Sequence, residues 1–173
     1  MEKFIPDMYQ KSIYHIDYDK LKEDGIKCLL IDLDNTCIPY KNKEPNKKLI
    51  DLFEMLKDMD FKVIIFSNAS KKRLYPFKNT LNVDCSARSR KPSTRKLLKI
   101  LKMFKYDLSD VVIIGDQLCT DILCGNKVGI KTILVNPMSK DDMIFTKVFR
   151  FIENRKFKYM AKMDILKKGK YYE

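Results

Sequence analysis

Between residues 27 and 135, short runs of Val, Ile and Leu alternate with longer segments in which apolar side chains recur at helical spacing, with lysines between them. The short runs are typical of buried strands, and the longer segments are typical of amphipathic helices. Repeated alternation of this kind indicates strand–helix–strand units, in which consecutive strands lie parallel in one sheet. The pattern therefore predicts an α/β fold of three layers, with a mainly parallel sheet between two layers of helices.

The apolar runs predict a sheet of five strands, at residues 27–33, 61–66, 83–86, 111–114 and 130–135. The run at 111–114 is almost entirely β-branched, so both of its faces are expected to be buried. Helical spacing predicts helices at residues 18–23, 46–58, 71–81, 92–103 and 120–128. Ser67 and Asn68 are expected to cap the helix at 71–81, and Pro92 is expected to open the helix at 92–103.

The length of the chain, 173 residues, fits one compact domain. We expect residues 27–137 to form its core and residues 1–26 to pack on that core as an N-terminal segment. Residues 138–173 are basic and lack a clear strand pattern. They are predicted to form a helical C-terminal extension with a lysine-rich end. One of its helices would have an apolar face made by Val148, Phe149, Phe151 and Ile152.

The composition excludes several classes of protein. Hydrophobic residues make up 45% of the chain and charged residues 34%, which is too apolar for a disordered chain. No apolar run approaches the length of about 20 residues that spans a bilayer, and the N-terminal residues lack the pattern of a secretory signal. The five cysteines form no CxxC pair, which is typical of reduced thiols, and a single His argues against a zinc site at Cys119 and Cys124. We therefore expect a cytoplasmic protein, either free or peripheral at the inner face of the membrane.

The chain carries 35 Lys and Arg against 23 Asp and Glu, a formal net charge of +12. Such a charge attracts polyanions, anionic membranes and phosphorylated substrates over a long range. The excess lysines can equally be solvated surface residues, since net charge says nothing about the fold. Charge alone thus leaves a phosphorylated substrate, a membrane lipid and a nucleic acid all open as partners.

Polar residues follow four of the predicted strands at the point where each strand ends. Because ligands of parallel sheets bind beyond the carboxyl ends of the strands, we expect these side chains to converge on one site. They are Asp32, Asp34 and Thr36 after the first strand, Ser67 and Asn68 after the second, Lys91 after the third, and Asp116 and Asp121 after the fourth.

Asp32 and Asp34 carry the clearest chemical signal. A strand that ends in a turn often has Asp, Asn and Thr there, so residues 32–36 also have an ordinary structural explanation. Alternate residues of a strand share a face, however, and two neighbouring carboxylates stay ionised only when a cation or a hydrogen-bond donor compensates them. Asp32 and Asp116 offer the hard oxygen ligands that Mg²⁺ prefers, and an aspartate can be the nucleophile of phosphoryl transfer.

Ser67 and Lys91 add groups that suit a phosphate. Ser67 contributes a hydroxyl at the start of a helix, where backbone amides attract an anion, and Lys91 contributes a full positive charge. Each residue also has a structural explanation, as a helix cap or as a solvated lysine. Their occurrence together with the aspartates, in this order, favours a Mg²⁺-dependent phosphoryl-transfer site.

The order of these residues resembles the haloacid dehalogenase (HAD) superfamily. Its four motifs are matched by DLDNT (residues 32–36), SN (67–68), KP (91–92) and GDQLCTD (115–121). The resemblance covers about residues 27–135. It implies the Rossmann-like fold of that superfamily and a phosphatase in which Asp32 is the nucleophile and Asp34 is the general acid and base.

The same resemblance implies roles for the other residues of the four motifs. Mg²⁺ would be held by Asp32, Asp116 and the backbone carbonyl of Asp34. The phosphoryl group would be held by Ser67 and Lys91. The supporting residues would be Thr36, Asn68 and Asp121, the last of these beside Lys91 and the waters of the metal.

Three longer segments resemble one subfamily more closely. They are FIPDMYQKSIYHIDYDKLKEDGIKCLLIDLDNT (residues 4–36), GDQLCTDILCGNKVGIKTILVNP (115–137) and TKVFRFIENR (146–155). These segments are similar to the YqeG-type phosphatases of HAD subfamily IIIA. That group is similar to the mitochondrial phosphatases that act on phosphatidylglycerophosphate, so the resemblance implies a lipid phosphate monoester as substrate.

The chain has no room for the cap domain that many HAD enzymes carry. About 30 residues separate Asp34 from Ser67 and about 24 separate Ser67 from Lys91, and a linker, a helix and a strand account for them. We therefore predict a capless fold with an open site, which suits a phosphate on a lipid, a protein or the end of a nucleic acid. The alternative, which the net charge of +12 favours, is a non-catalytic basic module that binds RNA or the ribosome on a HAD scaffold.

Overall fold

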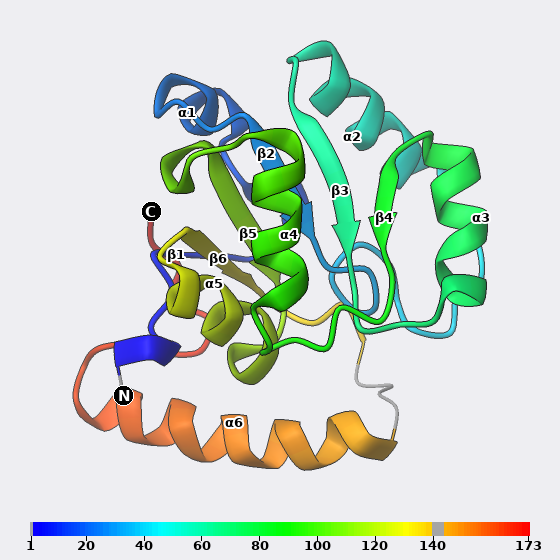
Figure 1. Cartoon of the computed structure of the whole chain (residues 1–173). Helices are drawn as coiled ribbons and strands as arrows, with labels where there is room; N and C mark the ends of the chain where they lie inside the picture. The colour runs from blue at the N-terminus through cyan, green and yellow to red at the C-terminus, as the bar shows by residue number, and fades with distance from the viewer. Residues whose placement is uncertain (1, 140–143) are drawn as a thin grey trace.

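The computed structural model of the chain describes residues 2–139 and 144–173, and the side chains of all of these except residues 144–151. Within this part of the chain, six strands form one sheet in the order β1-β6-β5-β2-β3-β4, and every neighbouring pair is parallel (Figure 1). The strands are β1 (Met8–Gln10), β2 (Cys28–Ile31), β3 (Lys62–Phe66), β4 (Asp84–Ser86), β5 (Val111–Gly115) and β6 (Lys131–Val135). The predicted α/β class with a parallel central sheet is confirmed.

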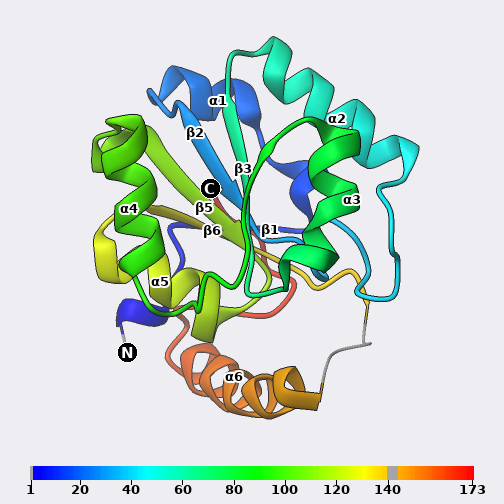
Figure 2. The same ribbon diagram turned by 45° about the vertical axis from the view of Figure 1, so that its right-hand side comes forward.

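Helices cover both faces of the sheet (Figures 1 and 2). The α-helices are α1 (Tyr18–Glu23), α2 (Lys47–Asp58), α3 (Lys71–Leu81), α4 (Arg95–Phe104), α5 (Leu123–Val128) and α6 (Ile144–Lys162). Short 3-10 turns lie at η1 (Glu2–Phe4), η2 (Ile13–His15) and η3 (Leu108–Asp110), and η4 (Leu118–Ile122) is a π-helical turn.

The sheet has six strands instead of the predicted five, because β1 joins its edge. The three residues of β1 are too few to show an alternating pattern. Met8 pairs with Ile133 of β6, and the backbone of Tyr9 exchanges hydrogen bonds of 2.9 and 3.0 Å with Tyr172 near the end of the chain. Since both partners are distant in sequence, only the folded chain makes this segment a strand.

Three predicted helices differ from the structure in a detail at their start, although α3 spans residues 71–81 as predicted. The cap of α3 is Ser70, whose side chain accepts a hydrogen bond from the amide of Arg73, and not Ser67 or Asn68. Helix α4 begins at Arg95, after a turn that contains Pro92. The helix predicted at 120–128 is divided into η4 and α5. In the first two cases, the residues that the local pattern assigned to a helix start belong to loops at the carboxyl ends of the strands; in the third, residues 120–122 form part of the π-helical turn.

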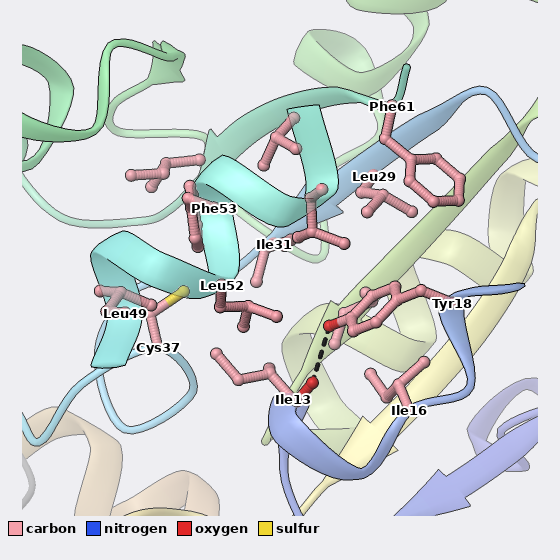
Figure 3. Close-up of a cluster of buried hydrophobic side chains, with 14 of the residues drawn as sticks. Ile13, Ile16, Tyr18, Leu29, Ile31, Cys37, Leu49, Leu52, Phe53 and Phe61 are labelled. Atoms are coloured by element: carbon pink, nitrogen blue, oxygen red, sulfur yellow. Dashed lines mark hydrogen bonds between the residues drawn. The ribbon is translucent and has the colours of Figure 1, made fainter. Parts of the chain in front are cut away.

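Alternating side chains of the central strand β2 face two apolar cores. Leu29 and Ile31 belong to the core under α1, α2 and α3, where Phe53 is fully buried (Figure 3). Cys28 and Leu30 belong to the core under α4 and α5. Because β2 is buried on both faces, it is a rigid base for the residues that follow it.

The C-terminal residues pack against the sheet beside β1. Met160 and Leu166 are buried with Tyr9 and Leu118 in a third apolar cluster. Helix α6 lies across the end of the molecule at which the strands finish (Figures 1 and 2). The predicted apolar face of this helix falls mostly on side chains outside the described set, and Ile152 is 41% exposed. Among the helices that the structure describes, none is both long and apolar enough to cross a bilayer. The division of the chain near residues 26 and 137 stays a prediction.

Candidate active site

Three buried carboxylates meet at the carboxyl ends of β2 and β5. Asp32 directly follows β2, and its backbone amide donates to the carbonyl of Ile114 at 2.9 Å, so the sheet itself holds this residue. Asp116 directly follows β5, and Asp121 lies in η4. Each of the three offers an oxygen within 4.8 Å of the others. All three residues are at most 8% exposed, so the cluster is part of the interior of the fold.

Lys91 lies at the centre of this cluster. Its Nζ donates to Asp32 Oδ1 at 2.6 Å, to Asp121 Oδ1 at 2.5 Å and to the backbone carbonyl of Phe66 at 2.7 Å. Only 2% of the Lys91 side chain is exposed. A buried ammonium is stable when it is paired and its donors are satisfied, and Lys91 meets both conditions. The alternative of a solvated surface lysine is thereby excluded.

Burial and mutual charge shift the pKa values of this cluster. Burial raises the pKa of Asp32 to about 8, a shift that Lys91 opposes and that Asp121 and Asp116 increase. Burial alone would lower the pKa of Lys91, but the carboxylates of Asp121 and Asp32 outweigh it and raise that pKa above its ordinary value. Lys91 therefore stays protonated beside three carboxyl groups. A positive charge bound next to Asp32 would favour its ionised form, and the hard oxygen atoms of the cluster are the ligands that a divalent cation such as Mg²⁺ prefers.

Asp121 has both of its oxygens engaged within the protein. Oδ1 accepts from Lys91, and Oδ2 accepts from the amide of Gln117 and the hydroxyl of Thr120, each at 3.2 Å. Asp121 can lie this close to the end of β5 because residue 115 is Gly: a Cβ there would stand 2.2 Å from Asp121 Cγ. These contacts suit Asp121 to support Lys91 instead of binding a ligand directly.

Thr36 and Asn68 each hold another residue of the cluster. The hydroxyl of Thr36 donates to Asp116 Oδ1 at 3.0 Å. The amide of Asn68 pairs with the backbone of Lys91 at both ends, since Nδ2 donates to the Lys91 carbonyl at 3.1 Å and Oδ1 accepts from the Lys91 amide at 2.7 Å. Asn68 thus fixes the segment that carries Lys91 next to the end of β3.

Ser67 directly follows β3 and is 2% exposed. Its amide donates to the carbonyl of Ser86 at 3.0 Å, and its carbonyl accepts from the amide of Ser89 at 2.9 Å. Its Oγ accepts a hydrogen bond of 3.2 Å from the amide of Ala69. Within the described residues the hydroxyl donates no hydrogen bond, so its hydrogen can be donated to an oxygen of a ligand.

Asp34 is paired with a residue that the sequence patterns did not indicate, Arg73. The Nε and Nη2 atoms of Arg73 donate to Asp34 Oδ1 at 3.0 and 2.8 Å, and its Nη1 donates to the carbonyl of Asn42. Burial raises the pKa of Asp34, and the hydrogen bonds and charge of Arg73 oppose that shift. Arg73 lies in the first turn of α3, shortly after Ser67. This position near the SN motif is the one sequence signal that could have identified Arg73 as a site residue. The Asp34 carboxyl group is therefore held by Arg73 of α3, which is itself bonded to the loop at Asn42.

Helix α6 contributes a buried acid to the same region. The carboxylate of Glu153 accepts a hydrogen bond of 2.9 Å from the backbone amide of Cys119 in η4, and Glu153 is 2% exposed. Since η4 also carries Asp121, the C-terminal extension is bonded to the loop that supports Lys91. Nothing in the local sequence pattern pointed to this contact.

Comparison with known proteins is consistent with this geometry. The family described as HAD-hydrolase-like matches residues 88–140, a range that includes Lys91, Asp116 and Asp121. The protein of Bacillus subtilis (strain 168) named "Probable phosphatase YqeG" is 37% identical over 152 residues, which make up 88% of this chain and 88% of that protein.

Two more distant similarities concern a plant protein and a solved structure. The phosphatidylglycerophosphate phosphatase 1 of Arabidopsis thaliana, chloroplastic/mitochondrial, is 26% identical over 152 residues, which make up 82% of this chain and 43% of that protein. The cobalt-bound deoxy-D-mannose-octulosonate 8-phosphate phosphatase of Haemophilus influenzae superposes with a TM-score of 0.53 at 15% identity, covering 82% of this chain and 92% of that one. The second similarity is one of fold.

Proposed function

The chain belongs to the YqeG family of phosphatases, among the HAD-hydrolase-like proteins, and we propose that it hydrolyses phosphate monoesters through a phosphoryl intermediate on Asp32. The observation that carries this proposal is the buried cluster in which Lys91 bridges Asp32 and Asp121, with Asp116 alongside. A carboxylate nucleophile, a fixed cation and a site for a metal are the groups that phosphoryl transfer requires. The family assignment also argues against the alternative of a non-catalytic RNA-binding module.

In the first step of the proposed reaction, an oxygen of Asp32 attacks the phosphorus atom. The bond between phosphorus and the ester oxygen breaks as the new bond forms, and the carboxyl group of Asp34 donates a proton to the leaving alcohol. Asp34 suits this task because burial raises its pKa and so favours a protonated fraction. The products of the step are the free alcohol and an acyl phosphate on Asp32.

In the second step, water attacks the same phosphorus atom. Asp34, now a carboxylate, takes a proton from that water, the acyl phosphate bond breaks, and inorganic phosphate leaves. The Asp32 carboxylate and the Asp34 proton are thereby restored, so that no other reactant is consumed.

The surrounding residues act by holding charge in place. Lys91 is fixed by Asp32, Asp121 and the carbonyl of Phe66, so its ammonium is already oriented when the substrate arrives. Preorganised charge of this kind stabilises negative charge that develops on the phosphoryl oxygens. The free hydroxyl hydrogen of Ser67 offers a further donor to those oxygens.

Mg²⁺ is the proposed cofactor. Asp32, Asp116 and the backbone carbonyl of Asp34 would hold the ion, since Asp121 is engaged by Lys91, Gln117 and Thr120. When bound, the ion would supply positive charge beside the phosphoryl oxygens and would favour the ionised form of Asp32, which the attack on phosphorus requires.

We further propose that the substrate is a phosphate monoester on a lipid, such as phosphatidylglycerophosphate. The similarity to the Arabidopsis thaliana phosphatase named for that lipid supports this choice. Among the described residues, no insertion large enough for a cap domain separates β2 from α3 or α3 from α4, so no cap domain at these positions would restrict the substrate to small metabolites. The net charge of +12 suits an anionic lipid surface.

The chemistry is tested with Asp32→Asn, which keeps the shape of the side chain and removes the nucleophile. We expect release of phosphate from an aryl phosphate to fall by at least about 10³-fold. EDTA should abolish wild-type turnover and Mg²⁺ should restore it. The matched control is Asp51→Asn on the exposed face of α2, which should leave turnover unchanged. Wild-type rates in Asp32→Asn would refute the proposed nucleophile.

A further inference from the structure

A groove runs along the free edge of the sheet. Its floor is the edge strand β4, and its walls are α3 on one face of the sheet and α4 on the other, an arrangement that Figure 1 shows. The groove encloses about 570 Å³, which is within the range of about 300–1,000 Å³ of pockets that hold small molecules. We refer to it as the edge groove.

The interior of the edge groove is apolar. Leu74 from α3 and Ile100 and Phe104 from α4 line it. At its mouth, Tyr75 and Met103 are 66% and 60% exposed. Large apolar side chains that converge on one exposed concave surface are unusual in a monomeric protein and mark a binding surface. Exposure of these side chains to water is unfavourable unless an apolar ligand covers them.

The rim of the edge groove is basic. It carries the lysines Lys71, Lys78, Lys96 and Lys99. The one acidic residue of the lining, Asp84, is paired with Lys62 at 2.5 Å. In the part of the chain that the structure describes, Lys71, Lys78 and Lys99 form no ion pair. An apolar interior under an uncompensated basic rim is complementary to an anionic amphiphile, whose chain is apolar and whose head group is negatively charged.

The edge groove begins beside the candidate active site. Ser86 lines the groove, and its carbonyl accepts the hydrogen bond from the amide of Ser67. Lys71, which also lines the groove, is the first residue of α3 and follows shortly after the SN motif in the chain. The groove and the candidate site therefore adjoin at the residues that follow β3 and β4, which is the arrangement that one ligand occupying both would require.

We propose that the edge groove binds an acyl chain of the lipid phosphate substrate, with the rim lysines beside the lipid's other anionic groups. This inference rests on the proposed function. A second copy of this chain, paired through β4, fits the groove less well. Two edge strands related by a two-fold axis would bring two sets of unpaired lysines together.

The test compares substrates that differ only in acyl chain length. Dibutanoyl, dihexanoyl and dioctanoyl phosphatidylglycerophosphate are assayed below their micelle-forming concentrations, with the deacylated head group as reference. For the wild type we expect kcat/KM to rise with chain length, by up to about fourfold for each CH₂ group that becomes buried. The same kcat/KM at every chain length would overturn the inference.

Variants at the mouth of the groove test whether the groove, and not the rest of the surface, causes the chain-length dependence of kcat/KM. Met103→Glu and Lys99→Glu should each reduce kcat/KM for the dioctanoyl lipid by about tenfold and flatten its rise with chain length. The controls are Leu98→Glu and Lys102→Glu, which make the same chemical changes on α4 outside the groove. Leu98 is 50% exposed, similar to Met103. All four variants should hydrolyse an aryl phosphate at the wild-type rate.

The outcomes distinguish this inference from the proposed function. Suppose that Asp32→Asn loses aryl phosphatase activity while Met103→Glu keeps the wild-type chain-length dependence. This result would overturn the groove as an acyl-chain site and would support Asp32 as the nucleophile. A dimer that dissociates in Met103→Glu while the chain-length dependence persists would assign the groove to a second copy. A wild type that hydrolyses the deacylated head group as well as the dioctanoyl lipid would overturn both the groove and the lipid substrate.

Discussion

The active-site cluster and the edge groove both contain lysines, but the two regions treat their charges in opposite ways. In the cluster, Lys91 is 2% exposed and its ammonium is bound by three oxygen atoms. In the groove, Lys78 and Lys99 lie exposed on the rim without an ion pair among the described residues, next to the exposed apolar side chains of Tyr75 and Met103.

This contrast separates two ways in which a fold prepares for a ligand. The cluster is joined by hydrogen bonds within the protein, and its three carboxyl groups offer ligand atoms for a cation within 4.8 Å of one another. Its charges do not have to reorient, which is the condition for strong electrostatic catalysis. The groove instead leaves apolar area and positive charge facing water, so its favourable energy is realised only when a ligand binds. Under the proposed function, the cluster would serve the reaction and the groove would serve selection of the substrate.

The largest effect should follow from Lys91→Met, which removes the charge of the cluster and keeps most of the volume. Asp32 and Asp121 would then lose the ammonium that compensates their buried charge, so we expect the free energy of unfolding to fall by about 3–5 kcal/mol. Phosphate release should fall by at least about 10³-fold. Urea unfolding and an aryl phosphatase assay measure the two effects.

The matched control for that variant is Lys99→Met on the rim of the groove. Because this lysine is exposed and forms no ion pair among the described residues, its loss should change neither the urea midpoint nor aryl phosphatase activity. Equal effects of the two substitutions would remove the distinction between the two regions.

An intermediate effect should follow from Gly115→Ala. The added Cβ would stand 2.2 Å from Asp121 Cγ, so Asp121 must shift and carry the Lys91 ammonium with it. We expect a loss of about 1–3 kcal/mol in stability from overpacking and a loss of about 100-fold in kcat from misplaced charge. Wild-type kcat in a protein of normal stability would show that the cluster tolerates displacement.

A smaller and more selective effect should follow from Arg73→Ala, because Arg73 acts through Asp34. Under the proposed function Arg73 is a positioning residue, and its loss leaves Asp32 and Lys91 in place. We expect kcat/KM to fall by about 30-fold for phenyl phosphate, whose leaving oxygen needs a proton, and by about threefold for p-nitrophenyl phosphate, whose leaving group does not.

The control for Arg73→Ala is Lys72→Ala, its exposed neighbour in α3. That variant should behave as the wild type with both substrates. The same loss with both leaving groups in Arg73→Ala would mean that Arg73 stabilises the loop without orienting the proton donor.

The sequence alone was sufficient for the α/β class, the parallel sheet and the residues that surround the cluster. Those features depend on local patterns: apolar runs of strand length, helical spacing between them, and polar residues at the point where a run ends. Asp32, Ser67, Lys91 and Asp116 could be located because the ends of neighbouring parallel strands necessarily lie at one edge of the sheet. The resemblance of the same motifs to a known superfamily added their expected roles.

Only the tertiary structure decided how those residues are bonded and what lies around them. The strand β1, the pair of Asp34 with Arg73 and the bond from Glu153 to η4 each join segments that are distant in sequence. The edge groove exists because α3 and α4 pack on opposite faces of β3 and leave β4 uncovered between them. A local pattern determines which face of a helix is apolar, but the partner of that face depends on which segments the whole chain brings together.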